Sequence, residues 1–124
     1  MNAVSFDSNI LIDALNGHEV AREEIRRADV PCISRVTWIE VLSKVQGDSM
    51  PIVIRFLNGF TIDELDVDIA GRAAQLRRER TRLKLADSVI LASAQAAGRV
   101  LVTRNTKDFP ATMPGIRVPY RIEQ

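Results

Sequence analysis

Residues 4–15, VSFDSNILIDAL, contain the change of hydrophobic period that decides the fold. Val4 and Phe6 alternate with polar neighbours, as in a β-strand, whereas from Ile10 onward apolar residues return at helical spacing. The polar residues 7–9 lie where the period changes. The stretch therefore predicts a strand followed at once by a helix, the opening unit of an α/β fold.

Asp7 stands at the end of this predicted strand. Open α/β sheets bind their ligands in a crevice beyond the carboxyl ends of the strands, so Asp7 is placed as a functional acid would be. The same position suits a helix N-cap, because Asp oxygens accept hydrogen bonds from the first free amides of a helix. This stretch alone leaves both interpretations open.

Segments with strand and helix patterns alternate along the rest of the chain. Further strands are predicted at 31–33, 60–62, 100–103 and, as an edge strand, 116–118. Helices are predicted at 19–28, 34–47, 52–57 and 85–97, and a further one starts at Asp66 or Asp68 and runs to about residue 83. The alternation predicts a three-layer α/β/α fold with a mainly parallel central sheet. Without a linker, repeat or low-complexity tract, residues 1–124 are predicted to form a single domain.

Composition is that of an ordinary globular protein, with 46% hydrophobic residues in 124. No apolar run approaches the roughly 20 residues of a membrane span, and no secretory signal is recognisable, which predicts a cytoplasmic protein with no membrane partner. The single cysteine, Cys32, lies in an apolar stretch. It is expected to pack as a small core residue, a reactive thiol being the alternative.

The overall charge of +1 excludes no class of partner, but the distribution of charge is uneven. Six basic residues against one acid, Glu79, occupy the segment 72–84: Arg72, Arg77, Arg78, Arg80, Arg82 and Lys84. A local basic stripe can bind phosphates even on a neutral protein. The alternative is a solvated helix face without a ligand.

Several classes of site are absent from the sequence. There is no P-loop, GxGxxG, CxxC or HExxH motif, which argues against nucleotide-cofactor and zinc sites. The only histidine, His18, follows Gly17 at the end of a predicted helix and is expected in an exposed loop. Serine-histidine-aspartate chemistry and histidine-based RNA cleavage are therefore disfavoured.

Carboxylates at predicted strand ends are the remaining candidates. Asp7 and Asp108 each follow a predicted strand. Asp87 begins the apolar helix that precedes the strand at 100–103, and it is either the cap of that helix or a functional acid. Two carboxylates 4 Å apart repel by about 4 kcal/mol at an effective dielectric constant near 20, so such a cluster needs a cation or shared protons. Oxygen ligands select Mg²⁺ or Mn²⁺, which predicts metal-assisted phosphoryl hydrolysis.

Glu40 lies in the predicted helix that begins after Ser34. On a helical wheel the apolar side chains from Trp38 to Val45 share one arc, and Glu40 falls on the other side with Val36. Periodicity alone therefore places Glu40 in water or at a rim.

Four blocks together resemble a known family. They are FDSNILID (6–13), TWIEVL (37–42), LADSVILASA (85–94) and VLVTRNTKDF (100–109), and they span nearly the whole chain. In this order they resemble PIN-domain ribonucleases, specifically the VapC-type toxins of bacterial toxin–antitoxin pairs. The resemblance implies that Asp7, Glu40 and Asp87 are catalytic acids that bind metal, which gives Glu40 a role that periodicity did not suggest.

The resemblance also assigns supporting residues. It implies that Asn9 and Thr103 orient the pocket. Many relatives carry Asp two residues beyond the strand threonine, where this sequence has Asn105, with Asp108 three residues later. Asp108 is expected as an outer catalytic residue and Asn105 as a neutral oxygen ligand, and either one is a candidate for the fourth ligand position.

The implied activity is a Mg²⁺- or Mn²⁺-dependent endoribonuclease that uses metal-activated water and leaves a 5′-phosphate and a 3′-hydroxyl. The resemblance further implies a homodimer and a small VapB-like antitoxin that blocks the acidic pocket with a basic group. Contacts to the RNA backbone are expected from Arg77, Arg78, Arg80, Arg82, Lys84, Arg104 and Lys107.

Two other functions remain as alternatives. A catalytically degenerate PIN-like module that binds RNA or protein is expected to lack one of the acids, and this sequence keeps all three. A phosphohydrolase with Asp7 as covalent nucleophile needs a second acid nearby and a lysine. Asn9 occupies the place of that acid, which weakens this alternative.

Overall fold

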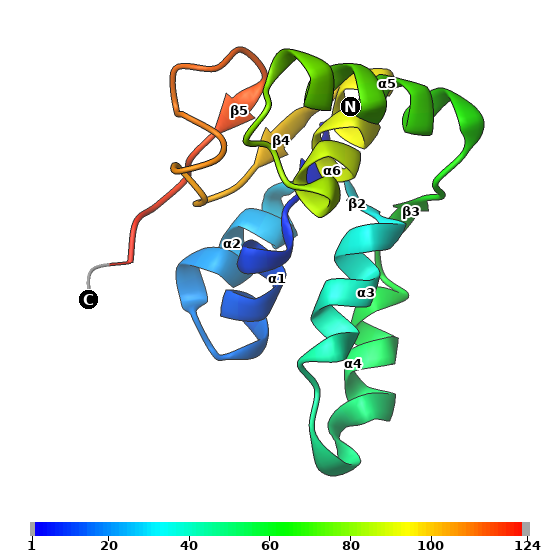
Figure 1. Ribbon diagram of the computed structural model, residues 1–124. Helices are drawn as coiled ribbons and strands as arrows, with labels where there is room; N and C mark the ends of the chain where they lie inside the picture. Colours follow the sequence, from blue (N-terminus) through cyan, green and yellow to red (C-terminus); the bar gives the residue numbers. More distant parts are fainter. Residues whose placement is uncertain (1, 123–124) are drawn as a thin grey trace.

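The computed structural model describes residues 2–122, which form a five-stranded parallel sheet with helices on both faces (Figure 1). The strand order is β3-β2-β1-β4-β5, and every neighbouring pair is parallel. The strands are β1 (Ala3–Phe6), β2 (Val30–Ser34), β3 (Thr61–Asp63), β4 (Val100–Val102) and β5 (Ile116–Arg117). The predicted three-layer α/β/α fold is confirmed, with β1 at the centre of the sheet.

The helices form the two outer layers. They are α1 (Ser8–Leu15), α2 (Glu19–Arg27), α3 (Arg35–Ser43), α4 (Met50–Leu57), α5 (Val67–Glu79) and α6 (Leu85–Ala96), with a short 3₁₀ turn at Gly47–Ser49. Figure 1 shows α5 above the sheet and α4 at the lower end of the view. No helix within the described part of the chain is long and apolar enough to cross a membrane.

Two apolar cores hold the layers together. Side chains of α1, α2 and α4 pack with Phe6 and Val102 on one face of the sheet. Side chains of α5 and α6 pack with Leu101 on the other face. Because Leu101 and Val102 are successive strand residues, they point to opposite faces, and β4 contributes to both cores.

Local predictions agree with the structure at several positions. Ser34 caps α3, its hydroxyl accepting from the Val36 amide at 3.1 Å, and Asp66 caps α5 by accepting from the Ile69 amide at 2.8 Å. Cys32 is fully buried, as expected for a core residue.

Two apolar positions depart from helical periodicity. Val20 on α2 is 51% exposed, and Ile39, which the predicted apolar arc of 38–45 includes, is 53% exposed. On α2 the buried face instead contains Glu24, whose Oε1 lies 2.7 Å from Arg117 Nη1. Because this glutamate is ion-paired, it can occupy an inward position that a hydrophobic pattern assigns to an apolar residue.

Candidate active site

The strand order brings Asp7 and Thr103 together. Phe6 pairs with Val102 in register across β1 and β4, so the residues that follow them leave the same edge of the sheet. The Thr103 hydroxyl donates to Asp7 Oδ2 at 2.7 Å, and both side chains are buried. The strands that Asp7 and Thr103 follow are therefore neighbours, and their carboxyl ends lie at one edge of the sheet.

Asp7 is both a helix cap and a member of this polar cluster. Its Oδ1 accepts from the Ser8 amide at 2.8 Å and so caps α1. Its Oδ2 accepts from Thr103 and, at 3.3 Å, from Asn9 Nδ2. Burial raises the pKa of Asp7; the hydrogen bonds from Thr103 and Ser8 counteract it only in part. The two interpretations of Asp7 are therefore compatible.

Glu40 reaches the same cluster from α3. The Ser8 hydroxyl donates to Glu40 Oε1 at 2.8 Å and lies 3.4 Å from Asp7 Oδ1, so it bridges the two carboxylates. Glu40 is half-buried, which agrees with the rim position that periodicity gave. Val36, on the same face of α3 as Glu40, packs against the core of α5 and α6. Glu40 therefore lies at the rim of the candidate site.

Asp87 lies in the first turn of α6. Residues 97–99 link α6 directly to β4, so the helix runs opposite to the strands and begins at their carboxyl edge. Lys84 occupies the N-cap, and Asp87 is the third residue of the helix. Asp87 is therefore not the cap of α6. Burial, followed by the charges of three other carboxylates, raises the pKa of Asp87 to about 6; these carboxylates are Asp7, Asp108 and Glu40.

Asp108 and Asn105 form a pair beside Thr103. Asn105 Nδ2 donates to Asp108 Oδ2 at 3.0 Å, and the Asp108 amide donates to Asn105 Oδ1 at 3.3 Å. The Asn105 amide in turn donates to Thr103 Oγ1 at 3.0 Å. The loop after β4 thus turns its polar side chains towards the end of β1.

The donor chemistry of this edge fits a hard divalent cation. Carboxylates come from four different segments, and Asn105 and Thr103 add neutral oxygens, the ligand types that Mg²⁺ and Mn²⁺ prefer. Within residues 2–122, no three Asp, Glu, His or Cys side chains form a ready-made cage for an ion. Asp7 and Glu40 are instead bridged by the Ser8 hydroxyl, and Thr103 donates to Asp7 alone.

Basic side chains lie next to the acidic cluster. Arg80, Arg82 and Lys107 line a hollow of about 350 Å³ that Asp108 also borders. Arg77 and Arg78, in the last turn of α5, are exposed, as is Lys84. The expected basic stripe therefore reaches the edge of the sheet that carries the carboxylates.

Arg104 differs from the other residues that are predicted to contact the RNA backbone. Its guanidinium donates twice to Asp13, from Nε to Oδ2 at 2.6 Å and from Nη2 to Oδ1 at 2.9 Å. Asp13 is buried on α1 and was not identified from the sequence. No local pattern singles it out, because its partner lies 91 residues away.

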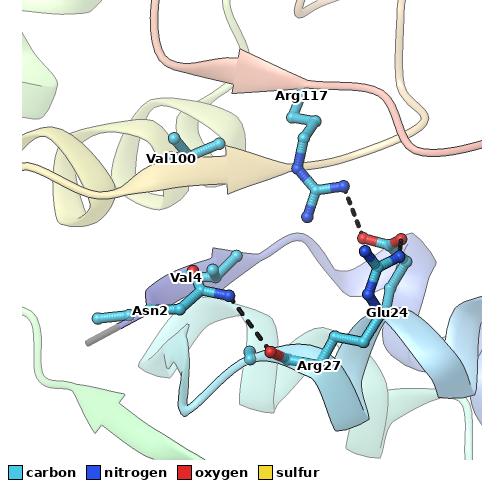
Figure 2. A pocket seen from close by; sticks show the side chains of 8 residues that line it. Asn2, Val4, Glu24, Arg27, Val100 and Arg117 are labelled. Carbon is cyan, nitrogen blue, oxygen red and sulfur yellow. Dashed lines mark hydrogen bonds and ion pairs between the residues drawn. The ribbon is translucent and has the colours of Figure 1, made fainter.

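A second hollow, of about 500 Å³, lies at the opposite, amino edge of the sheet (Figure 2). Val4 and Val100, near the starts of β1 and β4, border it, and the Glu24–Arg117 ion pair spans one side. Asn2 Nδ2 donates to the Arg27 carbonyl across its floor at 3.3 Å. None of the candidate acids borders this hollow, so the carboxyl edge is the candidate active site.

Comparison of the sequence with known families and proteins gives concordant matches. A family model described as PIN domain matches residues 4–112. The tRNA(fMet)-specific endonuclease VapC of Shigella flexneri is 32% identical over an alignment of 87 residues, with coverage of 63% of this chain and 66% of that protein. The match thus spans slightly less than two thirds of this relative's length.

Solved structures resemble the whole fold. A chain of a toxin–antitoxin complex from Klebsiella pneumoniae superposes with a TM-score of 0.87 and 40% identity, over 96% of this chain and 99% of that one. A chain of the DNA-bound VapBC complex of Salmonella typhimurium has a TM-score of 0.76 and 26% identity, over 94% and 96%. FitAcB of Neisseria gonorrhoeae, with a TM-score of 0.78, 20% identity and coverage of 96% and 99%, shares the fold.

The family match covers most of the chain, and the blocks around Asp7, Glu40 and Asp87 all lie inside it. The fold and the carboxyl-edge acids agree with that match. The chain therefore belongs to the PIN-domain family, in its VapC-type branch.

Proposed function

We propose that this chain is a divalent-cation-dependent endoribonuclease, the toxin of a VapBC-type toxin–antitoxin pair. The observation that carries the proposal is the arrival of Asp7, Glu40, Asp87 and Asp108 at one edge of the sheet. There burial, and then the charges of the other three acids, raise the pKa of Asp87. The similarity to a tRNA(fMet)-specific endonuclease VapC supports an RNA substrate.

In this proposal, Asp7, Glu40 and Asp87 hold a Mg²⁺ or Mn²⁺ ion. When bound, such an ion lowers the pKa of a water molecule and neutralises charge on the phosphodiester. With a pKa of about 6, Asp87 is mostly ionised at neutral pH and can serve as a ligand. Thr103 and Asn9 fix the orientation of Asp7 by donating to its Oδ2.

The loop after β4 supplies the outer side of the site. Asp108 contributes a further charge and Asn105 a neutral oxygen, and their mutual hydrogen bonds keep both turned towards Thr103. Either one is suited to the fourth ligand position.

The RNA backbone is proposed to approach along the basic hollow. Arg80, Arg82 and Lys107 present cations beside Asp108, so phosphates bound there lie next to the carboxylates. The exposed cations Arg77, Arg78 and Lys84 extend this surface along α5 and the start of α6. Such contacts position the strand and leave base recognition to the shape of the RNA.

An antitoxin partner is supported by the source of the similar structures, which are toxin–antitoxin complexes. We propose a small VapB-like protein that places a basic side chain against the four carboxylates, since a charge-assisted pair would relieve their repulsion. The homodimer stays a prediction. Analytical sedimentation of the partner-free chain would check it by giving the mass of the particle in solution.

The two alternative functions fit the site less well. A degenerate binding module has no need of four acids at one edge of the sheet, where burial and the charges of the other three raise the pKa of Asp87. A phosphohydrolase with Asp7 as covalent nucleophile needs a second acid nearby, and Asn9 stands in that place, where its Nδ2 donates to Asp7 Oδ2.

The test is incubation of the partner-free protein with total RNA and Mg²⁺, followed by mapping of the ends. Metal-dependent cuts with 5′-phosphate and 3′-hydroxyl ends are expected. Asp87→Asn should abolish them, whereas Asp48→Asn, at an exposed acid in the 3₁₀ turn, should cut like the wild type. Ends with a 2′,3′-cyclic phosphate, or a trapped phosphoenzyme, would contradict the proposal.

A further inference from the structure

Asp13 is a buried carboxylate that the proposed chemistry does not use. It lies on α1 and is only 4% exposed. Arg104 binds it through two parallel hydrogen bonds, of 2.6 and 2.9 Å, the strong two-pronged form of an ion pair. The Tyr120 hydroxyl also donates to Asp13, at 2.7 Å. Three segments far apart in the sequence therefore meet at this carboxylate.

Arg104 is held to α1 at two points. Its backbone amide donates to Asn9 Oδ1 at 3.3 Å, and its guanidinium pairs with Asp13. Asn9 and Asp13 are four residues apart in a helix, so they lie on the same face, one turn apart. Together they fix both the place and the direction of residue 104.

The chain neighbours of Arg104 both belong to the candidate active site. On one side, Thr103 donates to Asp7 at 2.7 Å, and on the other, Asn105 donates to Asp108 at 3.0 Å. A rotation of the backbone at residue 104 would displace one or both of these side chains. The contacts of Arg104 are thus suited to set the geometry of the site without touching the reacting atoms.

We infer that the Asp13–Arg104 ion pair, supported by Tyr120, positions the loop 103–108, so that these three are positioning residues. The inference rests on the proposed nuclease function and gives Arg104 this role in place of an RNA contact. Stability is a weak reason for such a pair, because desolvating two charges offsets much of their attraction. The two-pronged ion pair fixes the direction of the Arg104 side chain, and a loop that presents metal ligands needs such a fixed geometry.

The positions of the polar partners make the role testable by substitution. Asp13→Asn keeps the shape of the side chain but removes its charge. We expect kcat on RNA to fall about 10- to 100-fold, the usual effect of losing an outer partner of a metal-site residue, with KM nearly unchanged. Arg104→Lys keeps the cation but loses the two-pronged geometry, and we expect a similar fall in kcat.

The double variant separates positioning from RNA binding. If both residues act as one unit, Asp13→Asn combined with Arg104→Lys should be little worse than either single variant. A rise in KM with kcat preserved, in either single variant, would overturn the inference and return Arg104 to the RNA surface.

A second ion pair provides a matched control. Arg99 and Asp63 pair at 2.6 Å with side chains 17% and 15% exposed, away from the loop 103–108. Asp63→Asn should lower the melting temperature much as Asp13→Asn does, while kcat stays at the wild-type value. If both variants lower kcat equally, Asp13 acts through general stability and the inference is wrong.

Amide hydrogen exchange in the metal-free protein gives a readout independent of activity. The amides of Arg104 and Asn105 donate to Asn9 and Thr103 and should be protected. In Asp13→Asn they should exchange about tenfold faster or more, and in Tyr120→Phe moderately faster, while Asp63→Asn leaves them unchanged. Unchanged exchange in Asp13→Asn overturns this inference; wild-type protein that cleaves no RNA overturns the proposed function instead.

Discussion

The Thr103 hydroxyl donates to Asp7 Oδ2 at 2.7 Å, across 96 residues of sequence and between the ends of two adjacent strands. Both side chains are buried, so the bond lies beyond the reach of bulk water. It ties the loop after β4 to the first acid of the candidate site.

Thr103→Val removes this donor and preserves the shape of the side chain. The buried carboxylate of Asp7 then loses a hydrogen bond that lowers its pKa, so the pKa should rise further. The free energy of unfolding should fall by about 1–3 kcal/mol in urea titrations at neutral pH. Thr61→Val, at an exposed position of β3, should change it by less than about 0.5 kcal/mol. Equal losses in the two variants would contradict a special role for the bond.

Manganese should stabilise the folded wild-type protein. At about a hundredfold excess over Kd, a ligand that binds only the folded state adds about 2.7 kcal/mol, visible as a higher melting temperature. Asp87→Asn should lose most of this gain, because it removes a charged ligand. The exposed Asp48→Asn should keep it. An undiminished response in Asp87→Asn would mean that the ion binds elsewhere.

Asp87 should also make the stability of the metal-free protein depend on pH. Its folded pKa of about 6 lies above the ordinary value of 3.8, so the folded state holds the proton more tightly than the unfolded state. The resulting stabilisation is complete below about pH 3.8 and is lost as the pH rises through about 6. Relative to Asp87→Asn, the wild type should therefore lose stability over this range in urea titrations with EDTA. A constant difference between the two proteins would contradict the raised pKa.

The basic hollow should contribute to RNA affinity in a salt-dependent way. Replacing Arg80, Arg82 or Lys107 by Gln should weaken binding of catalytically inactive Asp87→Asn protein to single-stranded RNA. Each lost phosphate contact should lower the slope of log Kobs against log salt by about 0.7. Arg55→Gln, on the distant α4, should leave the slope unchanged (Figure 1). A loss of RNA affinity with no change in this slope would argue against phosphate contacts.

Much of the fold could be predicted because its pattern is local. The change of period at Asp7 gives β1 and α1, and the apolar segments at 85–97 and 100–103 give a buried helix and an inner strand. Strand ends that carry Asp7 and Asp108 then indicate the edge at which a site would form. These inferences need only neighbouring residues and the rule that parallel strands share an edge.

The position of Glu40 was harder to predict. Helical periodicity assumes a single apolar face, whereas α3 contributes to both cores, with Val41 in one and Val36 against the other. Ile39 of the same helix is exposed, which a single apolar arc does not predict. A helix between two cores has no single polar side, and it was the family resemblance that assigned Glu40.

The sequence does not predict a role for Asp13. In sequence it is one polar residue at the end of an apolar helix, with nothing to distinguish it from a solvated position. Its partners, Arg104 and Tyr120, come from the last part of the chain. Only the three-dimensional structure brings them to the same carboxylate.

The pairing of β1 with β4 has a consequence for how the protein is made. A ribosome that has translated residues 1–99 has already produced Asp7, Glu40 and Asp87, yet it has not produced the strand whose end orients Asp7. A nascent polypeptide of that length therefore contains the three acids without the hydrogen bond that orients the first of them.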